Sequence, residues 1–352
     1  MGYFQKGVNR VTGMVNGEIL EQEEYSFIRT DEHLGKRVIL LGLAGSYSYG
    51  TNIETSDIDI RGITLNRRSD LIGLTQYGQY VDENTDTVIY AFNKIITLLL
   101  NCNPNTIELL GLRKEHYLYL SDTGQELLDN RALFLSKRAV NSFGGYADAQ
   151  LRRLQNALAR DSYPQSEREQ HIYNSVKNAM HDFNRQYKRY REGSVEIFID
   201  RAENPDFDTE IFVNAQLKHY PLRDYAGMWN TMANVVRDYD RIGKRNKKKD
   251  DLHLNKHAMH LIRLFLTALD ILEKGEIHTY REKEHDLLMD IRSGKFQRAD
   301  GTFHDSFYDL VSEYEKRLHY AAEHTALPEE PDMERVQEFV MSVNERVVRD
   351  GD

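Results

Sequence analysis

Cysteine is almost absent from this sequence, because Cys102 is the only one among 352 residues. A lone cysteine excludes an internal disulfide framework and is typical of a reducing compartment. Residues 1–10 lack the apolar core of a signal peptide, and no apolar run approaches the length that crosses a membrane. We therefore expect a cytoplasmic protein with no membrane partner, in which Cys102 packs at the end of the apolar run Ile95–Leu100.

Basic residues are also fewer than acidic ones. The 46 Lys and Arg residues face 56 Asp and Glu residues, which gives a formal net charge of −10. Broad, non-specific binding to nucleic acid depends on many cations that neutralise phosphates, so this balance argues against it. One local exception is the basic run Lys244–Lys249, which is either a solvated loop or a device that steers a polyanionic substrate.

The length of the chain predicts two domains, each large enough to have a core. We place the boundary near residue 130, with a catalytic domain over 1–130 and a mainly helical domain over 131–352. In the first domain, Asn16-Gly17 predicts the turn of a small hairpin, and the other expected elements are strands at 38–43, 56–60 and 86–90 and helices at 91–101 and 105–112. In the second, we expect helices at 136–160, 166–193, 222–242 and 255–276 and a strand pair at 195–199 and 211–213.

The stretch 38–64 is the part of the sequence that points to chemistry. Its apolar run Val38–Leu43 predicts a buried strand, after which Gly45 permits close approach of a ligand. Ser46 is a candidate cap for a short helix whose free N–H groups favour an anion. Asp57 and Asp59 alternate with isoleucines, so on a strand both would share one face. Converging carboxylates repel each other and indicate a cation, for which oxygen ligands favour Mg²⁺ or Mn²⁺.

The Asp-x-Asp pair alone is a weak signal. Such pairs usually lie on a solvated strand edge, and they also occur in glycosyltransferases that hold nucleotide sugars. A Gly-Ser turn about a dozen residues earlier makes the pattern far more specific, since a phosphate-holding turn and a metal-holding carboxylate pair together suit nucleotide transfer.

The predicted helix 255–276 carries a second set of candidates. Lys256, His260 and Arg263 follow i, i+4, i+7 spacing on a face separate from its apolar residues. Three cations in line could grip a triphosphate, whereas the usual meaning of such a pattern is a solvated basic stripe. On the earlier helix 105–112, Glu108 either orients a catalytic group or lies on the helix surface. On 222–242, Tyr225 and Trp229 are expected to face the core, and a base-stacking platform is the second interpretation of this aromatic stripe.

Several blocks together resemble the DNA polymerase β nucleotidyltransferase superfamily, and within it the RNA-repair-pathway DNA-polymerase-beta-type family. The three main blocks are LAGSYSYGTNIETSDIDIRGI at 43–63, VIYAFNKIITLLLNCNPNTIELL at 88–110 and LNKHAMHLIRLFLTALDILEKGEI at 254–277. A weaker block, LLMDIRSGKF, lies at 287–296. The first block is specific to the superfamily rather than to one substrate.

The resemblance implies an α+β fold, in which an N-terminal nucleotidyltransferase domain with a mixed sheet and flanking helices precedes a helical C-terminal domain. It also implies metal-dependent transfer of a nucleoside monophosphate from an NTP, with ATP the expected donor, to a hydroxyl, releasing pyrophosphate. By the same resemblance, Gly45 and Ser46 would hold the triphosphate, while Asp57 and Asp59 would bind Mg²⁺ or Mn²⁺.

The superfamily also places a third carboxylate on a later strand. Asp86 is the best candidate for this catalytic and metal-binding position, since Asp82 and Glu83 lie in a polar loop. The strand around Asp86 departs from a clear match, so the residue could instead serve solubility at the start of the strand.

The acceptor stays open at the level of the sequence. An RNA or tRNA end is the leading hypothesis, because the run Lys244–Lys249 favours a polyanion. The acidic net charge favours a small molecule or a protein side chain. A nucleotide-binding regulatory module without turnover is the third alternative, and the intact Gly-Ser and Asp-x-Asp argue against it.

Overall fold

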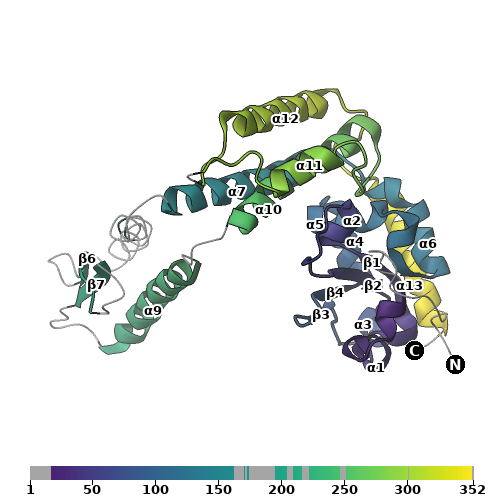
Figure 1. Cartoon of the computed structure of the whole chain (residues 1–352). Coiled ribbons are helices and arrows are strands. Elements are labelled where there is room, and N and C mark those ends of the chain that lie inside the picture. The colour runs from purple at the N-terminus through teal and green to yellow at the C-terminus, as the bar shows by residue number, and fades with distance from the viewer. Residues whose placement is uncertain are drawn as a thin grey trace. The chain divides into compact units, whose positions relative to one another are not determined.

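The computed structural model describes residues 17–161, 170, 173, 195–203, 209–215, 222–245, 251–299 and 301–350. They form two compact units (Figure 1). Unit 1 comprises residues 1–151 and 255–352, and unit 2 comprises residues 152–254. The boundary expected at residue 130 does not coincide with this division, because residues 255–352 pack with the part that contains the main sheet. An example is Phe339, whose ring lies edge-on to that of Phe92 at a centroid distance of 6.1 Å.

Unit 1 is built on a five-stranded mixed sheet with the order β3-β4-β2-β1-β5. Its strands are β1 (Val38–Leu43), β2 (Ile60–Thr64), β3 (Gln79–Asp82), β4 (Thr87–Ala91) and β5 (Tyr117–Leu120). β2 and β4 run parallel, and the other neighbours are antiparallel. The mixed sheet with flanking helices and a helical C-terminal region confirms the predicted fold class.

β1 is the strand on which the core of unit 1 is organised. All six of its residues are buried, as expected for an apolar strand with neighbours on both sides. Gly42 leaves room for the side chain of Leu112, because a Cβ at this position would collide with it. The predicted bounds of this strand are confirmed.

Helices and short helical turns surround the sheet (Figure 1). The α-helices of unit 1 are α1 (Phe27–Thr30), α2 (Gly45–Tyr49), α3 (Arg68–Ile72), α4 (Phe92–Leu100), α5 (Pro104–Ile107), α6 (Asp122–Asp129), α11 (His285–Arg292), α12 (Asp305–His324) and α13 (Met333–Asp350). Two longer helices, α7 (Arg138–Asp161) and α10 (Asp251–Leu269), belong to both units, and α10 continues as a π-helical turn, Asp270–Lys274. The 3₁₀ turns are Gly17–Glu21, Glu23–Tyr25, Gly35–Arg37, Glu108–Gly111, Lys114–His116 and Arg131–Phe134. No helix among these described residues is both long and apolar enough to cross a membrane.

Two local predictions in unit 1 are wrong. The strand expected over 56–60 begins only at Ile60, so Asp57 and Asp59 lie in the loop that precedes β2. The hairpin expected at Asn16-Gly17 is also incorrect, because a 3₁₀ turn starts at Gly17. Here the 3₁₀ turn buries Ile19 and Leu20, and this packing outweighs the local turn preference of Asn-Gly.

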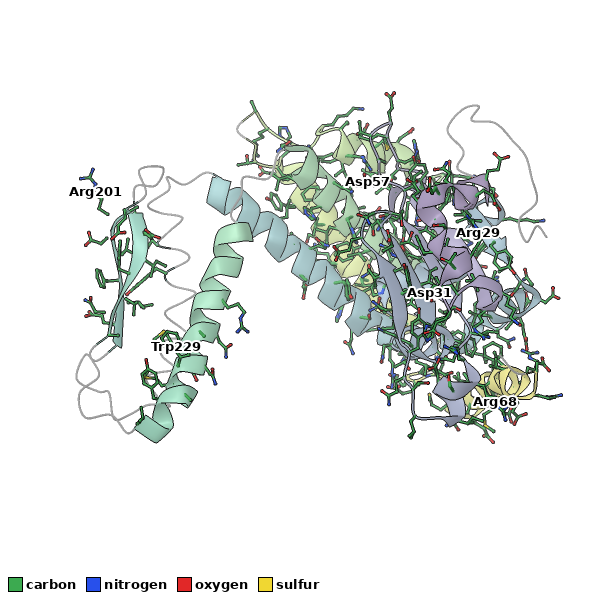
Figure 2. The ribbon with its side chains drawn as sticks, turned by 90° about the horizontal axis from the view of Figure 1, so that it is seen from below. Arg29, Asp31, Asp57, Arg68, Arg201 and Trp229 are labelled. Atoms are coloured by element: carbon green, nitrogen blue, oxygen red, sulfur yellow. The ribbon has the colours of Figure 1, made fainter. Side chains whose placement is uncertain are left out.

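In unit 2, the strands β6 (Val195–Arg201) and β7 (Thr209–Ala215) form the predicted antiparallel pair. α9 (Leu222–Arg245) follows, but Tyr225 and Trp229 do not face a core as expected. They are 42% and 60% exposed, and their rings stack on each other at 6.4 Å (Figure 2 labels Trp229). The covered side of the helix is instead marked by the buried Met228. The helix expected at 166–193, apart from residues 170 and 173, lies outside the described residues, as do the lysines 247–249.

Candidate active site

Two carboxylates come together at one edge of the sheet. Asp59 directly precedes β2 and Asp86 directly precedes β4. Because these strands are parallel and pair Ile60 with Thr87, the two aspartates arrive side by side. Burial, followed by the hydrogen bond and the charge of Asp86, raises the pKa of Asp59 to about 7. The hydrogen bond from Asp59 lowers the pKa of Asp86, so the pair keeps its negative charge mainly on Asp86.

Arg61, which the sequence reasoning missed, fixes the position of Asp86. Its Nη2 lies 3.1 Å from Oδ1 of Asp86, and its Nη1 donates to the Asp86 carbonyl at 2.5 Å. Asp86 has a positive φ of 44°, a backbone conformation that aspartate tolerates better than most residues. With a side chain that is 54% exposed, Asp86 faces solvent as well as Asp59. The one available signal was the position of Arg61, two residues after the Asp-x-Asp pair.

Asp57 lies two residues before Asp59 in the same loop. It is exposed in the loop before β2 (Figure 2), and it is not among the groups whose charges act on Asp59 or Asp86. Across the described residues, no group of three or more His, Cys, Asp or Glu side chains is arranged to hold a metal ion. Mg²⁺ in proteins is commonly held by one or two carboxylates together with substrate phosphates and water, so the Asp59–Asp86 pair fits such an ion. The predicted role of Asp57 as a metal ligand together with Asp59 stays a prediction.

The Gly-Ser turn lies directly against Asp59. Gly45 begins α2 with a φ of 58°, and a Cβ at this position would fall on the Asp59 carboxylate. The backbone N–H of Ala44 donates to the Asp59 carbonyl at 2.9 Å. Ser46 is buried in the first turn of the helix, whereas the cap position belongs to Ala44, so the predicted capping role of Ser46 is wrong. Gly45 is required here for both its conformation and its lack of a side chain.

The three predicted phosphate-binding residues of α10 occupy different surroundings. Lys256 is exposed, and its charge acts on both Asp59 and Asp86. Arg263 is only 9% exposed; its Cζ lies 3.8 Å from the centroid of the Tyr49 ring, and its Nη1 donates to the Gly45 carbonyl at 3.4 Å. His260 is partly buried between them on the helix. Lys256 is therefore close enough for its charge to act on the carboxylates, whereas Arg263 contacts the backbone of the Gly-Ser turn and the ring of Tyr49.

Glu108 is buried, so the interpretation that it lies on a helix surface is wrong. The interpretation that it orients a catalytic group stays a prediction. Burial raises the pKa of its carboxyl, and the nearby charge of Arg263 and a hydrogen bond with Tyr49 act in the opposite direction. A carboxylate in this position balances the buried guanidinium of Arg263. Glu108, Tyr49 and Arg263 thus link the short helix α2 to α10.

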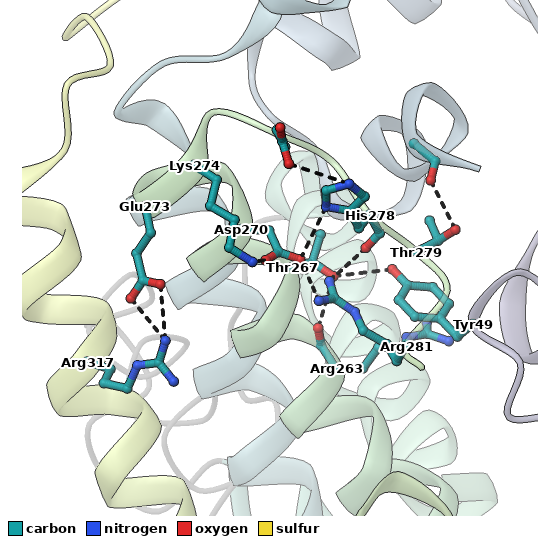
Figure 3. A network of polar contacts seen from close by, with 12 residues as sticks. Tyr49, Arg263, Thr267, Asp270, Glu273, Lys274, His278, Thr279, Arg281 and Arg317 are labelled. Carbon is teal, nitrogen blue, oxygen red and sulfur yellow. Dashed lines mark hydrogen bonds and ion pairs between the residues drawn. The ribbon is translucent and has the colours of Figure 1, made fainter. Parts of the chain in front are cut away.

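A polar network continues from Tyr49 along the end of α10 (Figure 3). The hydroxyls of Tyr49 and Thr267 are 3.5 Å apart, and Arg281 donates to Thr267 Oγ1 at 3.1 Å and to Asp270 at 2.5 Å. Lys274 donates to the other oxygen of Asp270 at 2.6 Å. Arg281 and Asp270 are both buried, so their charges are paired as burial requires. The sequence reasoning missed both residues, because their partners are fixed only by the fold.

Part of the chain is similar to a known protein family. Residues 19–184 match the model of the RNA repair pathway DNA polymerase beta family, a range that includes the main sheet, the Gly-Ser turn and all three candidate aspartates. No curated protein and no solved structure matches the chain. The match confirms the family resemblance that the sequence blocks indicate. The name of this family describes a group related to DNA polymerase beta in an RNA repair pathway. Residues 19–184, a little under half of the chain, are thus similar to the RNA repair pathway DNA polymerase beta family.

Proposed function

We propose that the protein is a metal-dependent nucleotidyltransferase that moves a nucleoside monophosphate from an NTP to a hydroxyl at an RNA or tRNA end. ATP is the expected donor, and pyrophosphate is the leaving group. The observation that carries the proposal is the Asp59–Asp86 pair, which lies at the start of two parallel strands with Gly45 packed against it. The match of residues 19–184 to a polymerase-beta-like family supports the same reaction class.

Mg²⁺ or Mn²⁺ would be held by Asp59 and Asp86, with the exposed Asp57 as the expected further ligand. When bound, such an ion offsets negative charge on the transferring phosphoryl group and lowers the pKa of the acceptor hydroxyl. This donor set consists of carboxylate oxygens, which these hard cations prefer.

The chain's own residues orient the reactants. The Gly-Ser turn brings backbone close to Asp59, which suits the close approach of a triphosphate. Lys256 adds a positive charge on the same side as the carboxylates, where it would balance phosphate charge. Arg61 holds Asp86 in its charged form, from which it can orient the acceptor hydroxyl. Catalysis of phosphoryl transfer depends mainly on such positioning and charge balance.

The test uses NTPs labelled at the α-phosphate, incubated one at a time with the protein, Mg²⁺ or Mn²⁺ and a mixed RNA pool. Label should appear in RNA, and it should disappear with EDTA or with Asp59→Asn. Parallel reactions with γ-labelled NTP distinguish nucleotidyl transfer from phosphoryl transfer, since only the latter would label RNA from the γ position. RNA that stays unlabelled by every α-labelled NTP would overturn the RNA acceptor.

A second acceptor class is favoured by the net charge of −10, which opposes binding to a polyanion. In this alternative the nucleotide goes to a small molecule or to a protein side chain. The same α-labelled reactions, supplied with a cell extract treated with RNase, would then show label in protein bands or in small-molecule fractions. NTP binding with no transfer in any reaction would instead indicate a regulatory nucleotide-binding module.

A further inference from the structure

The loop between α2 and β2 carries Asp57 and Asp59, so its conformation decides where both carboxylates point. Part of the loop is closed on itself. The N–H of Ile53 donates to Ser56 Oγ, and the N–H of Ser56 donates to the Ile53 carbonyl, both at 2.9 Å. The N–H of Thr51 donates to the Ser46 carbonyl at 2.9 Å, which ties the beginning of the loop to α2.

A single side chain from the other end of the chain bridges this loop. Arg292, in the last turn of α11, donates through Nη1 to the Thr51 carbonyl at 2.7 Å and through Nη2 to Ser56 Oγ at 3.1 Å. The two acceptors lie at the beginning of the loop and directly before Asp57. A planar guanidinium can reach two acceptors at once, which the single ammonium of lysine does less well.

The position of Arg292 is electrostatically unfavourable in itself. Burial lowers the pKa of its guanidinium, and the charge of Arg263 lowers it further. Both of its hydrogen-bond acceptors in the loop are neutral groups. Holding a partly buried cation beside another cation costs free energy, and the two hydrogen bonds with the loop offset part of this cost.

We propose that Arg292 is a positioning residue, which holds the loop Thr51–Ser56 so that Asp57 and Asp59 are presented to the metal and the nucleotide. The effect of Arg292 on nucleotide transfer rests on the proposed function, whereas its effect on the conformation of the loop is independent of that function. Without Arg292, Ser56 would keep its hydrogen bonds with Ile53, and the segment before Asp57 would lose its hydrogen bond to α11.

The first test is hydrogen exchange of the metal-free protein with Arg292→Lys and Arg292→Gln. The backbone amides of residues 52–58 should exchange faster by about tenfold or more, because removing a hydrogen bond from a charged donor corresponds to at least that factor. Amides of β1 should be unchanged. The matched control is Arg298→Lys, since Arg298 also bridges two acceptors, the Phe303 carbonyl at 2.6 Å and Asp305 at 3.0 Å, away from this loop.

The second test measures Mn²⁺ affinity by titration, together with the Mg²⁺ dependence of transfer. Both Arg292 variants should require about 10- to 100-fold more metal, as is typical when a residue that orients metal ligands is removed. The KM for NTP at saturating metal should change little. Ser56→Ala should act in the same direction. Its effect should be less than additive with that of Arg292→Gln, because both changes remove the Arg292–Ser56 hydrogen bond, although Ser56→Ala also removes the one from the Ile53 N–H.

Unchanged exchange of residues 52–58 in both Arg292 variants, or an equal increase in Arg298→Lys, would overturn the inference. A general decrease in protection that includes β1 would also overturn it, since it would assign Arg292 a role in overall stability. Failure of the proposed function has a different result: the wild-type protein would neither transfer a nucleotide nor bind Mn²⁺, while faster loop exchange in the variants would still support the bracing role.

Discussion

Asp59 and Asp86 are neighbours because each directly precedes one of two parallel strands, β2 and β4, whose first residues pair with each other. They are 27 positions apart by their residue numbers, yet they influence each other's ionisation. One carboxyl is partly buried and has a raised pKa, while the other is exposed and paired with Arg61. This asymmetry allows two acidic groups to coexist at neutral pH before a cation arrives.

The raised pKa of Asp59 predicts a pH-dependent stability in EDTA. The folded state keeps the proton up to about pH 7, whereas an aspartate in the unfolded chain loses it near pH ~3.9. The contribution of Asp59 to the free energy of unfolding therefore falls as pH rises from about 4 to about 7. Asp59→Asn should remove this decrease and be more stable than wild type above about pH 7 by on the order of 1–3 kcal/mol. Urea denaturation at a series of pH values measures it.

Asp57→Asn is the matched control, because Asp57 is an exposed carboxylate in the same loop. It should leave the pH profile of stability close to that of wild type. The lowered pKa of Asp86 acts in the opposite sense: its stabilising contribution is present above the pKa of the unfolded chain and is lost as pH falls through the folded value. A gain in Asp59→Asn that persisted below about pH 4 would contradict the assignment of the titration to Asp59.

Asp86 should respond differently to asparagine and to alanine. Both remove the charge, so both should abolish nucleotide transfer. Only alanine is poorly suited to the positive φ of 44°, which asparagine tolerates. Asp86→Ala should therefore unfold more easily than Asp86→Asn by about 1 kcal/mol. Thermal or urea unfolding measures this difference, and full transfer activity in the asparagine variant would remove Asp86 from the reaction.

Alanine substitutions at Lys256 and Arg263 should differ in their effects on the free energy of unfolding, although both should weaken NTP binding. Lys256→Ala removes an exposed cation near the carboxylates, so it should weaken NTP binding with little change in the free energy of unfolding. Arg263→Ala should weaken NTP binding by about 1–3 kcal/mol, and it should also destabilise the fold by a similar amount because a buried charged donor is removed. Calorimetric titration and urea denaturation measure the two quantities. An Arg263→Ala protein as stable as wild type would contradict the bracing role inferred from its contacts with Tyr49 and Gly45.

The basic run should reveal the class of acceptor through its salt dependence. If the acceptor is RNA, neutralising Lys247, Lys248 and Lys249 together should weaken its binding. The slope of log K against log salt should become shallower by roughly 0.7 for each phosphate of a single strand that the variant no longer neutralises. NTP affinity should stay close to that of wild type. Identical slopes for the two proteins would favour the small-molecule or protein acceptor.

Local patterns in the sequence were sufficient to predict those features that depend on residues close together in the chain. The apolar run of β1, the Gly-Ser turn after it and the strand pair β6–β7 follow from residues that are close in the chain, and the structure confirms them. The alternation of polar and apolar residues around Asp57 and Asp59 predicted a strand over 56–60, but β2 begins only at Ile60. The backbone N–H of Ala44 instead bonds the Asp59 carbonyl, and pairing with β4 begins at Ile60.

The sequence alone determined the fold class, the family resemblance and the position of the Gly-Ser and Asp-x-Asp motifs, because these depend on short stretches with strong local preferences. Only the tertiary structure decided which side chains meet: Asp59 with Asp86, Glu108 with Arg263, and Arg292 with Thr51 and Ser56, across 241 and 236 positions. Such contacts leave no periodicity in the chain, since each depends on the packing of elements that are distant in sequence. The same reason accounts for Tyr225 and Trp229, whose helical spacing predicts one face but does not specify what covers it.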